Sequence, residues 1–211
     1  KKESESDVRC YLIKKFKRFI VPLYVINLCY GIIATILQKN GIISYGSEFS
    51  LYNYFIAPWF GGNHYVLNGS MWFITQLFVV QVIYVLIRKV LSKIKWKDYL
   101  ILGCFIFLGF VAVFFSNKGF GVTFDYKMLI VRTMFFMQFY HIGYFYKEKL
   151  EKHDKINSMV YFSIIFALQL ILINISNSNL YYSTAYNQYS SIIFLPLLTS
   201  LTGIFFWLRI C

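Results

Sequence analysis

Four cations stand close together just before the first long apolar stretch of the sequence: Lys14, Lys15, Lys17 and Arg18. Lysine offers phosphate a point charge and arginine a bidentate fork, so this basic run has the chemistry of a phosphate site at a membrane surface. Positive-inside anchoring of a helix, or attraction to anionic lipid, explains most clusters of this kind. The residues alone leave both interpretations open.

Arg132 lies inside a later apolar stretch, about one helical turn from its start. A charge that faces lipid costs at least about 2.5 kcal/mol, so an intramembrane arginine is a functional candidate. The alternative is a side chain that snorkels to the interface. Asp125 precedes Arg132 by seven residues and would share its helical face, whereas His141 follows it by nine and would point to the opposite side. We therefore do not expect Arg132 and His141 in one site.

The two other polar candidates are a histidine and a loop on the side opposite the basic run. His64 has the chemistry to position an acceptor hydroxyl, although an ordinary surface histidine is the more common outcome. The uncharged segment 177–191 holds four tyrosines and suits either a sugar or the membrane interface. His141 suits a proton carrier or a histidine satisfied by helix packing. Hydrogen bonds between helices account for the glutamines of the apolar stretches, Gln76, Gln81, Gln138 and Gln169.

The sequence offers no metal site and no motif of a soluble enzyme. Its four cysteines show neither CxxC spacing nor a cluster with histidine. It also has no glycine-rich phosphate loop, no GxSxG elbow and no HExxH.

Composition defines the elements that must position these residues. Of the 211 residues, 58% are hydrophobic, 21% aromatic and only 14% charged, which excludes an ordinary soluble domain and a disordered chain. The net charge of +12 does not indicate nucleic-acid binding, because the cations lie in short connections between apolar runs. We therefore predict an all-α fold, a polytopic transmembrane helical bundle with the lipid bilayer as its partner and no nucleic acid.

Six apolar runs are long enough to cross the bilayer within one membrane domain, 1–211. The predicted spans are 19–37, 71–87, 99–115, 128–146, 156–175 and 191–208. Counted loop by loop, lysine and arginine alternate, with 17 on one side and three on the other. By the positive-inside rule, both termini of this multi-pass protein are expected in the cytoplasm, with the protein in the inner or plasma membrane.

Three stretches, in this order, resemble a known family. IKKFKRFIVPLYV, at 13–25, resembles the basic, proline-containing start of the third helix of membrane acyltransferase family 3, the integral-membrane O-acyltransferases. NGSMWFITQLFVVQVIYVLIRK, at 68–89, is similar to its tryptophan–phenylalanine helix. FFMQFYHIGYFYKEKL, at 135–150, is similar to a later helix of the family that ends in a Gly-Tyr pattern before a basic loop. The order and spacing agree over roughly residues 10 to 155.

The resemblance implies transfer of an acyl group, usually acetyl, from cytoplasmic acetyl-CoA to a hydroxyl of a cell-surface or lipid-linked polysaccharide. Acetyl-CoA is then the donor substrate, with no bound cofactor, and the basic run is expected to contact its phosphates. Arg132, Trp72 and His64 are expected to line the substrate path. A bacterial cell envelope fits this activity, and the composition is compatible with a bacterium of AT-rich genome.

The resemblance also places the start of this chain just before the third of about ten helices. The family's catalytic histidine would then precede Lys1, so the catalytic residue is unassigned, and the 211-residue piece alone is expected to be inactive. The alternative is a non-enzymatic polytopic protein, either a glycan exporter or the membrane module of a larger protein. Binding of acetyl-CoA would favour the enzyme, and glycan transport without acyl transfer the exporter.

Overall fold

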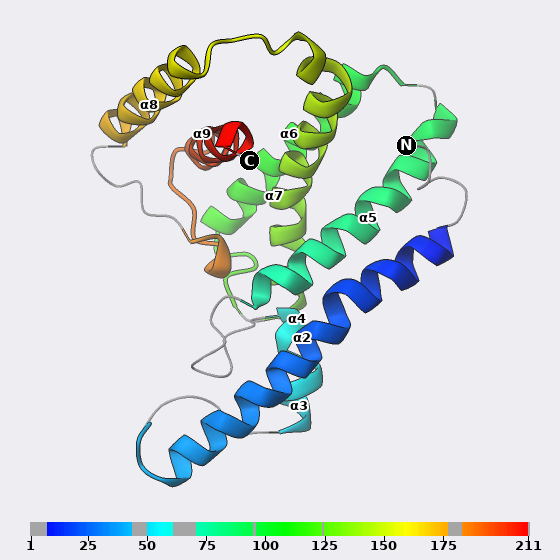
Figure 1. Cartoon of the computed structure of the whole chain (residues 1–211), viewed down its shortest axis with the longest axis vertical. Helices are drawn as coiled ribbons and strands as arrows, with labels where there is room; N and C mark the ends of the chain where they lie inside the picture. The colour runs from blue at the N-terminus through cyan, green and yellow to red at the C-terminus, as the bar shows by residue number, and fades with distance from the viewer. Residues whose placement is uncertain are drawn as a thin grey trace. The chain divides into compact units, whose positions relative to one another are not determined.

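The computed structural model describes residues 8–43, 50–60, 71–94, 96–123, 125–176 and 183–210. Within these ranges the regular structure is helical, and strand-like pairing is limited to an isolated bridge between Ser183 and Gln188 (Figure 1). The longer helices are α2 (Val8–Lys39), α5 (Trp72–Ile94), α6 (Asp98–Asn117), α7 (Tyr126–Phe145), α8 (Ser158–Ile175) and α9 (Leu195–Ile210). The shorter ones are α3 (Leu51–Phe55), α4 (Ala57–Phe60), the π-helix η2 (Tyr146–Leu150) and the 3₁₀ turns η3 (Glu151–His153) and η4 (Thr184–Tyr186).

The predicted all-helical fold is confirmed, and a helix covers most of each of the six apolar runs. Four helices are long and apolar enough to cross a membrane: α2, α5 over Trp72–Leu91, α6 and α8. Helix α9 is apolar but shorter, and α7 carries too many polar residues to meet the same measure. The predicted number of six spans therefore exceeds the number that length and composition support.

The chain divides into two compact units. The first comprises Lys1–Trp96 with Thr123–Thr133, and the second Lys97–Val122 with Met134–Cys211. Helix α7 is continuous across the division, so its first eight residues belong to the first unit and the remainder to the second.

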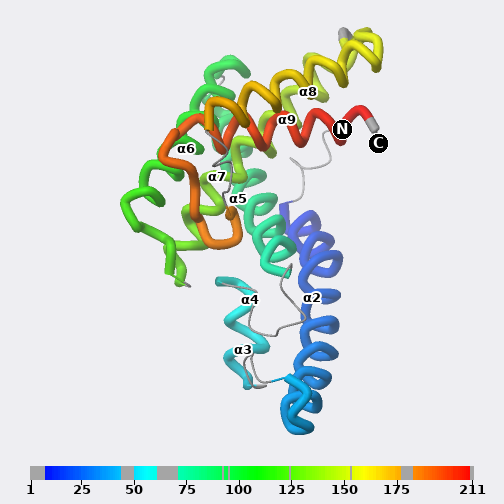
Figure 2. The backbone as a smooth tube through the Cα atoms, turned by 90° about the vertical axis from the view of Figure 1, so that its left-hand side faces the viewer, coloured from blue at the N-terminus to red at the C-terminus, as the bar shows by residue number. Residues whose placement is uncertain are grey.

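In the first unit, α2 and α5 run antiparallel and lie side by side (Figures 1 and 2). The rings of Phe16 on α2 and Phe78 on α5 meet edge to face, with their centroids 6.1 Å apart. Helix α2 is 32 residues long and starts at Val8, well before the apolar run expected at residue 19. It also contains Pro22, whose missing N–H leaves the carbonyl of Arg18 without its helical partner.

The aromatic segment between α2 and α5 packs along α2 through the two short helices α3 and α4. The Tyr24 hydroxyl donates to the carbonyl of Phe55 at 3.0 Å and accepts from the Trp59 indole N–H at 2.9 Å. Asn27, which is buried, donates to the carbonyl of Tyr54 at 3.2 Å. These bonds satisfy polar groups of both segments and hold the short helices against the second half of α2.

Helix α7 starts with a side-chain cap and then buries consecutive residues. The Asp125 carboxylate accepts from the backbone N–H groups of Lys127 and Met128 at 2.9 and 3.2 Å. Burial alone would raise the pKa of Asp125, but the hydrogen bond from the Thr123 hydroxyl at 3.0 Å, followed by the two backbone bonds, holds this pKa below its usual value. Val131, Arg132 and Thr133 are all buried, and three successive residues cover about 200° of a helix. This part of α7 is thus enclosed on more than one face.

In the second unit, α6 and the later part of α7 approach closely because of a glycine. A Cβ placed on Gly109 would lie 2.1 Å from Oε1 of Gln138, whose side chain is fully buried. One turn further along, the rings of Phe105 and His141 stack with centroids 4.7 Å apart. The absence of a side chain at Gly109 therefore makes room for a polar residue of α7.

The segment before α9 forms a docked turn. Asn187 adopts a left-handed backbone conformation at φ 51°, is buried, and donates from its amide to the carbonyl of Gly121 at 2.7 Å. Tyr189 packs against Phe135 with ring centroids 4.6 Å apart. Helices α8 and α9 then pack together, and the Thr202 hydroxyl donates to Gln169 Oε1 at 2.5 Å. The described part of the tyrosine-rich segment therefore directs the Asn187 side chain inward.

Candidate functional site

Arg132 is the most deeply buried cation of the described chain, with 1% of its surface exposed. Its Nη1 donates to the carbonyl of Phe60 at 3.0 Å, and its Nη2 lies 2.8 Å from the Met128 sulfur. The guanidinium carbon stands 4.9 Å from the centroid of the Trp72 ring. The predicted pair of substrate-lining residues, Arg132 and Trp72, is thus in direct contact although 60 residues separate them in sequence.

Buried hydrogen bonds of α5 lie close to Arg132, and one of them joins α5 to α7 at the next residue of α7, Thr133. The Gln76 amide donates to the Thr133 hydroxyl at 2.8 Å, and that hydroxyl donates to the carbonyl of Leu129 at 2.7 Å. The Thr75 hydroxyl donates to the carbonyl of Pro58 at 2.9 Å. Within the described residues, the second polar atom of Gln76, Oε1, is buried without a hydrogen-bond partner. The Arg132 site therefore combines a fixed cation with an unused acceptor.

Burial decides what the Arg132 site can do chemically. A guanidinium keeps its charge even when buried, because its pKa lies far above neutrality. Contact with the face of Trp72 is worth about 2 kcal/mol when desolvated and fixes the orientation of the cation. Such a preorganised cation suits a developing negative charge or an anionic group of a substrate.

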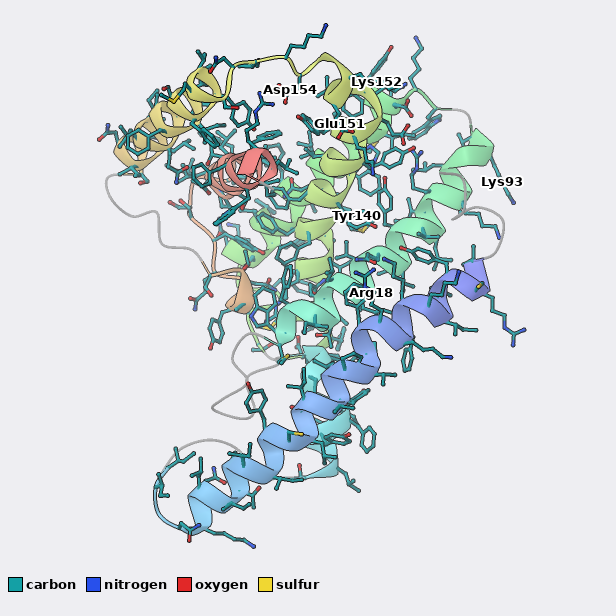
Figure 3. All side chains as sticks on the ribbon, viewed as in Figure 1. Arg18, Lys93, Tyr140, Glu151, Lys152 and Asp154 are labelled. Atoms are coloured by element: carbon teal, nitrogen blue, oxygen red, sulfur yellow. The ribbon has the colours of Figure 1, made fainter. Side chains whose placement is uncertain are left out.

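The basic run lies within the first half of α2, where Arg18 is labelled in Figure 3. Lys14, Lys17 and Arg18 are exposed, while Lys15 is half-buried with its Nζ 5.4 Å from the ring centroid of Tyr11. The four residues cover about half of the helix circumference, so they form a single cationic face. The helix thus presents three accessible cations within two turns.

Of the two candidate histidines, the structure describes His141 alone. His64 lies outside the described residues. His141 belongs to the second unit, where it is buried between α6 and α7 and stacks on Phe105, whereas Arg132 belongs to the first unit. Two roles were predicted for His141, a proton carrier and a packing residue between helices. The stacked geometry fits the packing role.

One polar cluster escaped the sequence analysis. After α7, the Tyr146 hydroxyl donates to Asp154 Oδ2 at 2.5 Å, and Arg209 forms an ion pair with the same oxygen at 3.1 Å. The hydrogen bond raises the pKa of Tyr146 to about 12. The same bond, followed by the Arg209 charge, holds the pKa of Asp154 below its usual value despite burial. Asp154 is one of only nine acidic residues, and this scarcity was the available signal.

An exposed ion pair lies on the same stretch of chain. Lys149 Nζ is 3.1 Å from an oxygen of Asp98, at the start of α6. The hydrogen bond to Asp98 and the charge of that carboxylate raise the pKa of Lys149. Both side chains are largely exposed, so the pair contributes little stability.

The helices long enough to cross a bilayer, together with an arginine buried among helices, define a polytopic membrane protein. The family model described as an acyltransferase domain matches residues 2–211. The chain therefore belongs to acyltransferase family 3. No match was found among curated proteins, and none among solved structures.

Proposed function

We propose that this membrane acyltransferase moves an acetyl group from cytoplasmic acetyl-CoA to a hydroxyl of a cell-surface or lipid-linked polysaccharide. In this reaction the acceptor oxygen bonds to the thioester carbonyl carbon, the carbon–sulfur bond breaks, and a general base takes the hydroxyl proton. The sulfur leaves as the thiol of CoA. Membership of the family supports acyl transfer in general, and the donor and acceptor are our proposal.

The observation that carries the proposal is the buried contact between Arg132 and Trp72. Negative charge develops on the carbonyl oxygen as the acceptor adds, and a fixed cation in a dry site stabilises it strongly. The unused Oε1 of Gln76, one turn along α5 from Trp72, is suited to accept from a sugar hydroxyl. His64 is proposed to lie on the acceptor side of the path.

The basic run on α2 is our proposed contact for the phosphates of the donor. Lys14, Lys17 and Arg18 are exposed and lie on one face, as a ligand with several phosphates requires. Arg18 supplies the bidentate fork and the lysines supply point charges.

We propose that α7 and α9 also cross the inner or plasma membrane, which gives six crossings and cytoplasmic termini. Helix α7 fails the hydropathy measure because of residues such as Arg132, Gln138 and His141, and these are buried in protein. A helix enclosed by other helices does not need an apolar surface. Helix α9 has 16 residues, close to the lower limit for a span.

The test is transfer of radiolabel from acetyl-CoA to alkali-labile esters of the envelope polysaccharide, measured in membranes that carry the protein expressed from its natural gene. We expect Arg132→Gln to lower kcat/KM by at least about 100-fold, as removal of one oxyanion donor does. Arg132→Lys keeps the positive charge but loses the bidentate fork, so its kcat/KM should lie between those of the wild type and Arg132→Gln. The control is Lys118→Gln, which removes an exposed cation and should leave the rate unchanged.

Two results would contradict the proposal. Normal ester formation by Arg132→Gln, with protein levels equal to the wild type, would remove the arginine from the mechanism. Export of polysaccharide without any labelled ester would favour the glycan exporter instead.

A further inference from the structure

Two neighbouring cavities open at the turn after α7, in the second unit, and the proposed acyl transfer uses neither. One, of about 410 Å³, is lined by residues that include Lys147, Glu151 and Arg209. The other, of about 330 Å³, is lined by residues that include Ile156, Ile165 and Phe205. Both volumes fall in the range of small-ligand sites.

The two cavities share one wall and differ in character. Tyr146 and Asp154 line both, so their 2.5 Å hydrogen bond stands between them. On one side of this bond the lining carries charges of both signs. On the other side it is mainly aliphatic and aromatic. A single ligand that fills both needs a polar part and an apolar part.

The positions of the two cavities relative to α8 are those expected for a bound lipid. The charged cavity is lined by residues that precede α8 together with Leu208 and Arg209 at the end of α9, and Figure 3 shows the labelled Glu151 and Asp154 at the turn between α7 and α8. The apolar cavity reaches Ile165, seven residues or about 10 Å into a helix long enough to cross the membrane. The pair of cavities therefore runs from a polar turn into the membrane-spanning part of α8.

The charges of the first cavity define the headgroup. Arg209 is already engaged, because it pairs with Asp154 and stacks on Tyr161 with its guanidinium carbon 5.1 Å from the ring centroid. Lys147 and Glu151 are exposed and form no ion pair within the described part of the chain. The available charges are thus one cation and one anion, which match a headgroup that carries both signs.

The backbone at the cavity is also unusual. Lys147 lies in η2, a π-helix of five residues that continues α7. Such π-helical turns are rare and occur often at functional sites, because the wider turn places side chains where an α-helix would not.

We infer that this site, called here the α7–α9 cleft and lined by Tyr146, Lys147, Glu151, Asp154 and Phe205, binds a zwitterionic phospholipid with a primary ammonium, of the phosphatidylethanolamine type. The phosphate lies against Lys147, the ammonium donates to Glu151, and one acyl chain follows α8 past Phe205. This inference goes beyond the proposed function and does not depend on it.

The experiment is photocrosslinking of the protein in nanodiscs with diazirine-labelled phosphatidylethanolamine, phosphatidylcholine or phosphatidylglycerol, read by peptide mass spectrometry. We expect phosphatidylethanolamine to label α8 near Ile165 and α9 near Phe205. Phosphatidylcholine, whose ammonium cannot donate, and phosphatidylglycerol, which has none, should label these positions less. The double variant Lys147→Gln, Glu151→Gln should lower the yield about tenfold, which corresponds to about 1.4 kcal/mol.

A matched control comes from the same stretch of chain. Glu148→Gln with Lys152→Gln makes the same change of charge at exposed residues that do not line the cleft, and should leave the yield unchanged. Lys147→Arg with Glu151→Asp should retain labelling, which separates loss of charge from loss of folding. Equal labelling by all three lipids, or equal loss in the control, would overturn the inference. Displacement of phosphatidylethanolamine by acetyl-CoA would also overturn it and assign the cleft to the donor.

Discussion

The contact between Gly109 and Gln138 gives the sharpest stability prediction, through Gly109→Ala. The new Cβ would lie 2.1 Å from Gln138 Oε1 and 2.2 Å from its Cδ, whereas real Cβ contacts essentially never fall under 3.0 Å. The amide must therefore retreat by about 0.9 Å, and because its side chain is fully buried in a close-packed interior, its neighbours must shift with it. Overpacking of this kind costs about 1–3 kcal/mol of the free energy of unfolding.

Gly103, in the same helix, provides a control for the effect of helix propensity on the stability of Gly109→Ala. Alanine is more favourable than glycine inside a helix by about 1 kcal/mol, and this gain applies equally to Gly103→Ala. A Cβ at Gly103 meets nothing within 4 Å. The difference between the two variants therefore isolates the clash. At about 2–4 °C per kcal/mol for a chain of this size, Gly109→Ala should melt about 2–12 °C below Gly103→Ala.

The assay is thermal unfolding of the protein in detergent, followed by the fraction that remains monodisperse after heating. The double variant Gly109→Ala, Gln138→Ala should recover most of the loss, because the amide forms no hydrogen bond within the described residues and the clashing atoms are gone. Equal melting temperatures for Gly109→Ala and Gly103→Ala would refute the close approach of the two helices. Failure of the second substitution to rescue would show that another contact causes the loss.

Three further changes test other contacts by the same measurement. Because the pKa of Asp154 is lowered in the folded protein, its stabilising effect is present above the unfolded pKa of about 4 and is lost as pH falls through the lower folded value. Asp154→Asn should thus lower the melting temperature at pH 7 and differ less from the wild type near pH 3. A difference in melting temperature that stays constant with pH would exclude the Asp154 charge as its cause. Asn187→Gly keeps the left-handed conformation but loses the bond to Gly121, and should cost about 1–3 kcal/mol, with Asn187→Ala worse; the reverse order would refute backbone strain there. Thr202→Val should lower the free energy of unfolding by about 1 kcal/mol, because the hydrogen bond to Gln169 is lost. A melting temperature equal to that of the wild type would show that this bond does not contribute to stability.

Sequence predicted the helices well because apolar length alone defines them. The run at 99–115 became α6 at Asp98–Asn117, with boundaries shifted by at most two residues. Helix α2 extends eleven residues further towards the N-terminus than its apolar run, because hydropathy measures where lipid fits and not where the helix starts. Hydropathy does not identify α7 as a span, because this helix contains polar residues that are buried in protein.

The candidate site was only half accessible to sequence reasoning. Arg132 stood out because a charge is costly inside an apolar run, but its contact with Trp72 depends on how α5 and α7 pack. The hydrogen bond between Tyr146 and Asp154, in contrast, joins two ordinary residues of a polar loop. Only the fold distinguishes this pair from other exposed polar residues.

The enclosure of α7 also has a consequence for how the protein is made. An arginine at the centre of a nascent helix opposes its release into the bilayer by about 2.5–3.5 kcal/mol, which is an upper limit for Arg132, and α7 adds glutamine and histidine to this cost. Its polar contacts come from helices already synthesised: Gln76 of α5 donates to Thr133, and Gly109 of α6 accommodates Gln138. We expect α7 to enter the membrane only while these earlier helices are still next to the translocon. Its insertion would then be cooperative, and the helices would assemble in the order of their synthesis.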